Sequence, residues 1–293
     1  AVNVTGGKVV NATATTGKVT IKGDALTTVT VKGGAANAID NLGTDAAATS
    51  GAGETLKSVT FEANATGTNT IDGNAIDTLT LKDQTAALTT TITNAKSTAL
   101  TVNLNNVNTV PSTVTAGSKA ETVTINSNGT KDNALTLVAA AGKTLNITGD
   151  AKLTLVDADV AKDVVSTNTK GVTITTALGT DVKFTGGTGA DTVTVAATTK
   201  AITMGAGDDK VIYTAAAGTG GSVDAGAGKD IISMSAADAA IISGKVDGKF
   251  NSTFSNFEVL EVIGGGASAV INTQKINNVS QVNIAGVGAL ITG

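Results

Sequence analysis

The sequence predicts an all-β fold, a parallel β-solenoid or β-roll built from short, ragged repeats. Two patterns and the composition support this prediction. Short apolar-Thr-apolar segments recur along the chain, and Gly-rich nine-residue motifs follow in its second half. Aromatic residues make up only 2% of the chain, whereas a globular core normally relies on them for large buried areas. A core of Val, Ile, Leu and Ala suits thin, layered β structure, because β-branched side chains favour strands.

The recurring segments have the period-2 alternation of strands with one buried face. Gly, Asn, Asp and Lys fill the positions between them, which indicates tight turns. The expected strands contain Val19–Ile21, Val29–Val31, Val59–Phe61, Leu79–Leu81, Val123–Ile125, Leu145–Ile147, Val172–Ile174 and Val193–Val195.

The spacing of these segments is uneven, so the remaining segments need separate assignments. We expect loops or corners at 41–55 and at 103–121, which contains Pro111, the sole proline. A β-sandwich is the alternative fold for residues 1–150. Helix is scarce, and Ser235–Asp238 resembles a capping box that opens one or two helical turns.

Three regions are expected from these patterns. They are a Thr/Val-rich β-repeat region at 1–170, a β-roll at 171–235 that carries the Gly-rich motifs, and a C-terminal β region at 236–293.

Composition also narrows the function. The net charge of −4 comes from dispersed residues, which argues against nucleic-acid binding, and no apolar run is long enough to span a membrane. The chain has no Cys and therefore no disulfides, and no secretory signal peptide is visible at its start. Without His and Cys, acid–base catalysis would depend on carboxylates, Lys and the single Tyr213, so we expect no enzyme.

One motif indicates specific chemistry. Residues 186–194 read Gly-Gly-Thr-Gly-Ala-Asp-Thr-Val-Thr, a full match to the calcium-binding repeat G-G-x-G-x-D-x-U-x. Degenerate copies at 204–212 and 225–233 keep the second and fourth Gly, the Asp and an apolar residue. The predicted metal-site residues are Gly186, Gly187, Gly189, Asp191, Gly205, Gly207, Asp209, Gly226, Gly228 and Asp230.

The spacing of the three aspartates fits stacked turns. Two nine-residue half-turns separate Asp191 from Asp209. The step from Asp209 to Asp230 is longer by three, so three residues must bulge out within Ala215–Gly221. Calcium takes six to eight oxygen ligands. Glycines let each turn curl until its carbonyls point inward, and the aspartates add charge. Each stacked pair of turns would therefore bind one calcium ion.

Four further aspartates are weaker candidates. Asp208 and Asp224 flank the motifs and are candidate additional ligands. Asp163 and Asp181 have the same spacing as Asp191 and Asp209, on the opposite edge, but lack glycines. We interpret them as solvated turn residues, with a ligand role as the alternative. Val195–Thr203 has neither Gly nor Asp, so only one edge of the roll should bind metal.

The repeats at 186–233 resemble those of RTX proteins. The surrounding Ala/Thr/Val/Gly-rich, cysteine-free repeats, and Asn256–Val262 after them, resemble the RTX-type surface-layer proteins of Gram-negative bacteria. The resemblance implies type I secretion, calcium-dependent folding outside the cell and assembly into a two-dimensional lattice. The expected partners are other copies of the chain and cell-surface polysaccharide or lipopolysaccharide.

Other functions remain as alternatives. A large calcium-dependent adhesin is the main one, although such proteins usually show near-identical repeats of about 100 residues. A β-helix enzyme acting on polysaccharide is another alternative, but no carboxylates cluster in this sequence with aromatic residues that could stack on sugar rings. Ice binding is suggested locally by Thr28-Val-Thr30, Thr78-Leu-Thr80 and Thr122-Val-Thr124, but their sequence spacing is too irregular to predict one flat array.

Overall fold

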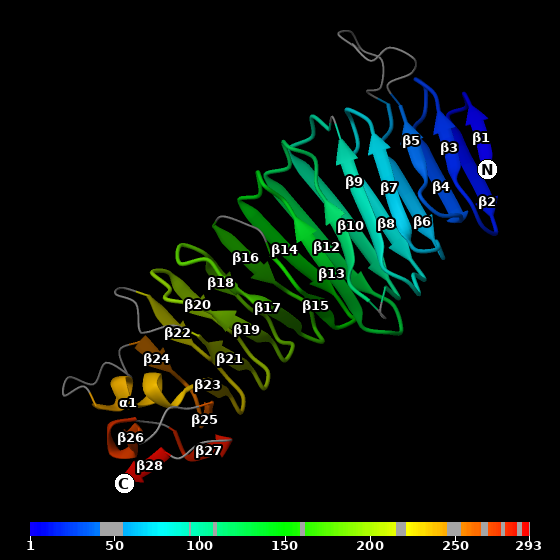
Figure 1. Cartoon of the computed structure of the whole chain (residues 1–293). Helices are drawn as coiled ribbons and strands as arrows, with labels where there is room; N and C mark the ends of the chain where they lie inside the picture. The colour runs from blue at the N-terminus through cyan, green and yellow to red at the C-terminus, as the bar shows by residue number, and fades with distance from the viewer. Residues whose placement is uncertain are drawn as a thin grey trace. The chain divides into compact units, whose positions relative to one another are not determined.

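A computed structural model describes residues 1–41, 55–93, 95–107, 110–158, 162–214, 221–244, 253–264, 269–276, 279–285 and 289–292. The chain divides into two compact units, Ala1–Val160 (unit 1) and Ala161–Gly293 (unit 2). Each unit consists of short parallel strands stacked as a β-solenoid (Figure 1). The predicted all-β solenoid fold is therefore confirmed, whereas the finer division at residues 170 and 235 stays a prediction.

In unit 1 the chain alternates between two parallel sheets, so that each turn of the solenoid adds one strand to each sheet. The first sheet contains β1 (Val2–Thr5), β3 (Val19–Lys22), β5 (Ala38–Asp40), β7 (Gly67–Asp72), β9 (Leu88–Thr93), β11 (Ser112–Thr115), β13 (Asn133–Val138) and β15 (Leu153–Leu155). The second contains β2 (Val9–Ala14), β4 (Thr28–Gly33), β6 (Ser58–Glu62), β8 (Thr78–Lys82), β10 (Ala99–Asn105), β12 (Thr122–Asn128) and β14 (Thr144–Gly149).

Unit 2 has the same alternation. One sheet contains β17 (Val172–Leu178), β19 (Thr192–Val195), β21 (Lys210–Tyr213), β23 (Ile231–Ser235), β25 (Val259–Ile263) and β27 (Gln281–Ala285). The other contains β16 (Asp163–Ser166), β18 (Lys183–Thr185), β20 (Ala201–Thr203), β22 (Ser222–Asp224) and β24 (Phe254–Ser255).

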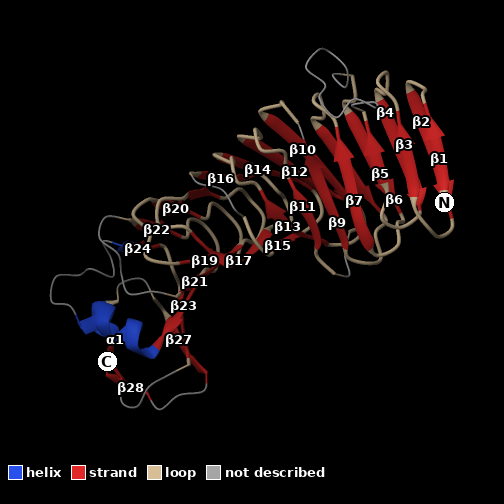
Figure 2. Cartoon of the chain, turned by 45° about the horizontal axis from the view of Figure 1, so that its top comes forward, coloured by secondary structure: helices blue, strands red, loops and turns tan. Residues whose placement is uncertain are grey.

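The C-terminal part of unit 2 adds three short features. They are helix α1 (Ala236–Gly244), a 3-10 helix (Thr273–Lys275) and a small parallel pair of β26 (Ala269–Asn272) and β28 (Ala289–Thr292). Figure 2 shows α1 in blue among strands in red. The hydroxyl of Ser235 accepts a hydrogen bond from the Asp238 N–H (3.1 Å), as the predicted capping box requires. At nine residues the helix is slightly longer than predicted.

All eight predicted strand segments lie in strands, but two sequence interpretations are wrong. Every described strand pair is parallel, so residues 1–150 do not form a sandwich of antiparallel hairpins. Segment 103–121 is not a loop throughout, because it contains the end of β10 and all of β11. Pro111 directly precedes β11, where its missing N–H does not interrupt the strand. Of the predicted loop at 41–55, all but its two end residues lie outside the described part.

The core consists of aliphatic columns. Burial alternates along the strands, and inward residues of one turn pair with inward residues of the next. Val29, Val59 and Leu79, for example, occupy paired positions in successive strands and are fully buried. Stacking places these side chains about 4.8 Å apart. Small branched residues fill such a narrow interior, which explains the near absence of aromatics.

The ragged repeat arises from turns of different length. Val2 pairs with Val19, whereas Ala38 pairs with Thr70, so the second of these turns is nearly twice as long as the first. The pairing nevertheless keeps inward residues facing inward. The sequence period therefore varies while the register does not.

The same effect aligns the outward polar residues. Thr30, Thr60 and Thr80 form one continuous row, although their sequence spacing is irregular. The sequence reason given against a flat array is therefore wrong for this face. Farther along the row, the amide of Asn103 donates to the Thr80 hydroxyl (3.3 Å), and Asn126 donates to Asn103 (2.7 Å). These side chains satisfy one another's hydrogen-bonding groups and link successive turns.

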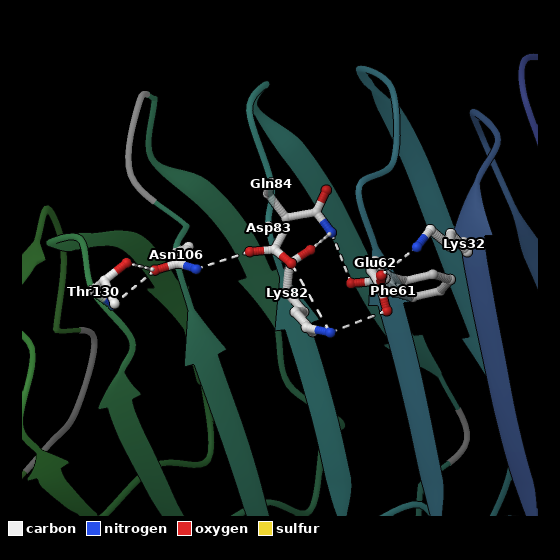
Figure 3. A network of polar contacts seen from close by, with 8 residues as sticks. All are labelled: Lys32, Phe61, Glu62, Lys82, Asp83, Gln84, Asn106 and Thr130. Atoms are coloured by element: carbon white, nitrogen blue, oxygen red, sulfur yellow. Dashed lines mark hydrogen bonds and ion pairs between the residues drawn. The ribbon is translucent and has the colours of Figure 1, made fainter.

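Ion pairs link the turns of unit 1 at the ends of its second-sheet strands (Figure 3). Glu62 on β6 contacts Lys32 on β4 at 2.8 Å and Lys82 on β8 at 3.4 Å. Beside them, the Gln84 side chain donates to the Phe61 carbonyl (2.7 Å). Hydrogen bonding to Lys32 holds the pKa of Glu62 below its ordinary value. Exposed ion pairs of this kind add little to the stability of the fold, and here they place charges of alternating sign on successive strands.

The corners that follow these strands need left-handed backbone. Asp83 and Asn106 have φ values of 51° and 58°. The Asp83 carboxylate accepts from the Asn106 amide (2.8 Å), whose oxygen accepts from the Thr130 N–H (3.0 Å) (Figure 3). Ala63 holds the equivalent corner with φ 48°. Asn and Asp tolerate this conformation, whereas a Cβ without a polar group is strained there.

We therefore expect Ala63→Gly to stabilise the protein by about 1 kcal/mol, because glycine adopts this conformation without strain. Ala99→Gly is the matched control, since Ala99 is also exposed but lies in regular strand β10. It should lower stability by about 0.5 to 1 kcal/mol. Thermal unfolding of both variants measures this, and a lower melting temperature for Ala63→Gly would contradict the assignment.

Candidate metal centre

The three predicted motifs form three stacked turns of unit 2, at 186–191, 204–209 and 225–230. Each leads from a strand of the β18–β20–β22 sheet into a strand of the β19–β21–β23 sheet. They bring together all the predicted metal-site residues: Gly186, Gly187, Gly189 and Asp191 in the first turn, Gly205, Gly207 and Asp209 in the second, and Gly226, Gly228 and Asp230 in the third.

Glycine is required because the turns stack backbone on backbone. Gly226 has φ +90°, and a Cβ there would overlap the carbonyl oxygen of Gly205 in the turn before. The Ala227 N–H donates to that same carbonyl (2.9 Å), and the Ala206 N–H donates to Gly187 (2.7 Å). The carbonyls of each turn therefore lie directly against the next turn.

The acidic side chains form a ladder across these turns. Asp209 accepts from the Asp191 N–H (2.7 Å), and Asp230 accepts from the Asp209 N–H (2.8 Å). Asp191 accepts in the same way from the Val172 N–H (2.7 Å). Glu258, which the sequence reasoning did not select, accepts from the Asp230 N–H (2.8 Å). We call these four residues the carboxylate ladder, and each member directly precedes a strand.

Two members of the carboxylate ladder have an unsatisfied oxygen. Asp209 and Asp230 are 1% and 0% exposed. One carboxylate oxygen of each takes the backbone hydrogen bond, and Oδ2 has no hydrogen-bond partner in the described part of the chain. None of the described lysines forms an ion pair with either residue. A buried carboxylate without a counter-charge is strongly destabilising, so these oxygens require a cation or a proton.

Both carboxyl groups have raised pKa values. Burial raises the pKa of Asp209 to about 7, and the charges of Asp191, Asp230 and Asp208 add to the rise. Burial likewise raises the pKa of Asp230 to about 6, with further contributions from Glu258, Asp208 and Asp224. In each case the backbone hydrogen bond acts in the opposite direction, but burial dominates.

Asp208 and Asp224, the predicted additional ligands, lie beside the ladder but are bonded to backbone. Asp208 accepts from the Lys229 N–H (2.9 Å). Asp224 accepts from the Gly226 N–H (3.1 Å) and from the Asn256 amide (2.7 Å). Each uses Oδ1 for these bonds, and both add negative charge around Asp230.

Asp163 and Asp181 lie elsewhere, with the strands of the other sheet. They line a hollow of about 510 Å³ with Lys162, Lys183 and Lys200. The exposed Asp181 also accepts from the Thr199 hydroxyl (2.7 Å). Lysines beside these carboxylates disfavour a divalent cation. Asp181 lies in a turn, as interpreted, whereas Asp163 is the first residue of strand β16, so the turn interpretation is wrong for Asp163. The predicted bulge falls almost entirely on 215–220, outside the described residues.

Unit 1 has neutral groups in the equivalent place. Asn37 precedes β5 and accepts from the Val19 N–H (3.1 Å), and Asn69 accepts from the Asn37 N–H (2.8 Å). We call Asn37 and Asn69 the amide rungs. The sequence reasoning missed them and Glu258 alike. The feature that all three share in the sequence is a polar residue two positions before a buried aliphatic residue, as at Glu258-Val-Leu260.

The carboxylate ladder fits calcium in its chemistry. Its groups are oxygens only, which suits a hard cation. Within the described residues, no three acidic side chains converge closely enough to hold a metal by themselves. A calcium ion would therefore take ligands from Asp209 or Asp230 and complete its shell with carbonyls of the glycine turns.

Comparison with known proteins identifies no relative. No protein-family model matches the chain, and no curated protein is significantly similar to it. Among the described residues, no helix is long and apolar enough to cross a membrane.

The raised pKa values predict a pH dependence. Without metal, the folded protein holds protons on Asp209 that the unfolded chain has released above the ordinary value of 3.8. Stability from this group is therefore present at acid pH and is lost as pH rises from about 4 to 7. Calcium competes with these protons, so calcium affinity should be roughly tenfold or more weaker at pH 5 than at pH 8.

Hydrogen exchange over 186–235 in chelator, at pH 5 and pH 8, measures the first effect, and calorimetric titration with calcium measures the second. Asp209→Asn is the control, because its neutral amide should reduce both dependences. Equal protection of the wild type at the two pH values would contradict an uncompensated buried carboxylate.

Proposed function

We propose that this chain is a structural protein of a bacterial cell surface, whose unit 2 is held together by calcium and which self-assembles into a two-dimensional layer. Calcium occupies the two spaces between the three glycine turns. The protein acts as a scaffold outside the cell and not as an enzyme. Cell-surface polysaccharide or lipopolysaccharide is the proposed anchoring partner.

The observation that carries the proposal is the pair of unsatisfied oxygens on Asp209 and Asp230. Protons could neutralise these groups at acid pH, but near neutrality they ionise and need a cation. Extracellular calcium modules bind with dissociation constants of roughly 10⁻⁴ to 10⁻³ M. A site of this kind is filled outside a cell, where calcium is abundant, and is empty inside it.

Exposed apolar side chains support self-assembly. Val9 on β2 is 63% exposed, an unusual amount for an apolar strand residue. A monomeric adhesin segment is the alternative, and the assembly experiment below separates the two.

Removing calcium should loosen residues 186–235 before unit 1, because the ladder carboxylates would then repel one another without a cation between them. Asp209→Asn should remove more bound calcium than Asp191→Asn, since the turn of Asp209 borders both spaces and the turn of Asp191 borders one. Limited proteolysis with and without chelator, together with calcium counting by native mass spectrometry, tests this. Proteolysis unaffected by chelator would refute the calcium assignment.

Folded protein should also associate as calcium rises through the millimolar range. Dispersed surface Asp and Lys leave room for calcium bridges between copies. Light scattering and electron microscopy of the purified chain would detect sheets of regular spacing. Particles that remain monomeric while the glycine turns are saturated would favour the adhesin alternative.

A further inference from the structure

Glu258 continues the carboxylate ladder beyond the last glycine turn. Its Oε2 accepts from the Asp230 N–H at 2.8 Å, just as Asp230 accepts from Asp209 and Asp209 from Asp191. Glu258 directly precedes β25, as the aspartates precede their strands. Each ladder carboxylate thus reaches back to the preceding turn, so Glu258 faces the space between that turn and its own.

The turn that carries Glu258 differs from the glycine turns. Only Asn256 and Phe257 separate it from β24, whereas five residues separate Asp230 from β22. The chain takes a left-handed step at Asn256 (φ 60°), and Phe257 is buried. The longer side chain of glutamate compensates for the shorter turn and reaches the same backbone N–H. This explains why the motif pattern ends at Asp230 although the ladder does not.

The surroundings of this space are strongly acidic. Asp230 is fully buried with an unsatisfied Oδ2, and Asp208, Asp224 and Glu258 are the charges that act on it. No described lysine forms an ion pair with any of these four residues. Asp224 is also tied to the Glu258 turn through the Asn256 amide (2.7 Å).

Six carboxylates lie in or beside these turns: the three motif aspartates, Asp208, Asp224 and Glu258.

We propose that a third calcium ion binds between the Asp230 turn and Glu258, with carboxylate oxygens of Asp230 and Glu258 among its ligands. This inference rests on the proposed calcium sites of the glycine turns and extends them by one. It makes Asp230 a residue shared by two ions, like Asp209, and not the end of the series. Asn256–Glu258 thereby becomes the metal-bound closure of the calcium roll.

The test counts calcium ions on the full chain by native mass spectrometry, with calorimetric titration of CaCl₂. The wild type should bind three ions and Glu258→Gln two, because the substituted amide still accepts the Asp230 N–H but loses the charge. Glu121→Gln is the matched control. Glu121 pairs with Lys143 (2.7 Å) on the exposed surface of unit 1, and its loss should leave three ions.

Each outcome is decisive. If Glu258→Gln binds as many ions as the wild type, with equal affinity, Glu258 is only a hydrogen-bonding cap and the third site is wrong. A wild type that binds two ions would also refute it, whereas one that binds none would refute the proposed function itself. Should Glu258→Gln fail to fold, Asp224→Asn replaces it. That variant keeps an oxygen for Gly226 and Asn256 and should weaken the weakest ion about tenfold. Unchanged affinity would overturn the proposal.

Discussion

Parallel backbone hydrogen bonding between successive turns is the constraint on which the rest of this structure depends. It fixes the register, so a residue that points inward in one turn is stacked on an inward residue of the next. Every interior position therefore becomes a column. An aliphatic column, such as that of Val29, Val59 and Leu79, needs no hydrogen-bond partner and no counter-charge. In a polar column the side chains stack about 4.8 Å apart, and each must find hydrogen-bond partners in the same way as its neighbours.

The two units meet this requirement with different chemistry. The amide rungs of unit 1 accept a backbone N–H and remain neutral. Within the described residues their buried Nδ2 groups have no hydrogen-bond partner, at moderate cost. The carboxylate ladder of unit 2 accepts the same backbone bond, but each added member brings another buried charge. Replacing an amide nitrogen by oxygen thus changes a neutral column into one that needs cations or protons. The need for this neutralisation follows from the repetition more than from any single aspartate.

Much of the fold was predictable, because alternation of apolar residues and threonine directly reports a strand with one buried face. The alternation does not report whether neighbouring strands run parallel, which is why a sandwich could not be excluded for residues 1–150. At 103–121, asparagines and Pro111 suggested a loop where β10 ends and β11 begins. The glycine motifs do form stacked turns, and whether these turns bind calcium stays a prediction. Glu258 escaped notice because its short turn has no glycine, and its position is defined only by a long-range hydrogen bond.

The freedom of turn length, set against the fixed register, has an evolutionary consequence. A change in turn length leaves the neighbouring columns in register, as the short turn from Val2 to Val19 and the long turn from Ala38 to Thr70 demonstrate. Selection on the interior therefore conserves only a scattered pattern of small apolar residues, while corners are free to diverge in length and chemistry. Sequences with this winding can therefore diverge at the corners and present new surfaces without any change in the core.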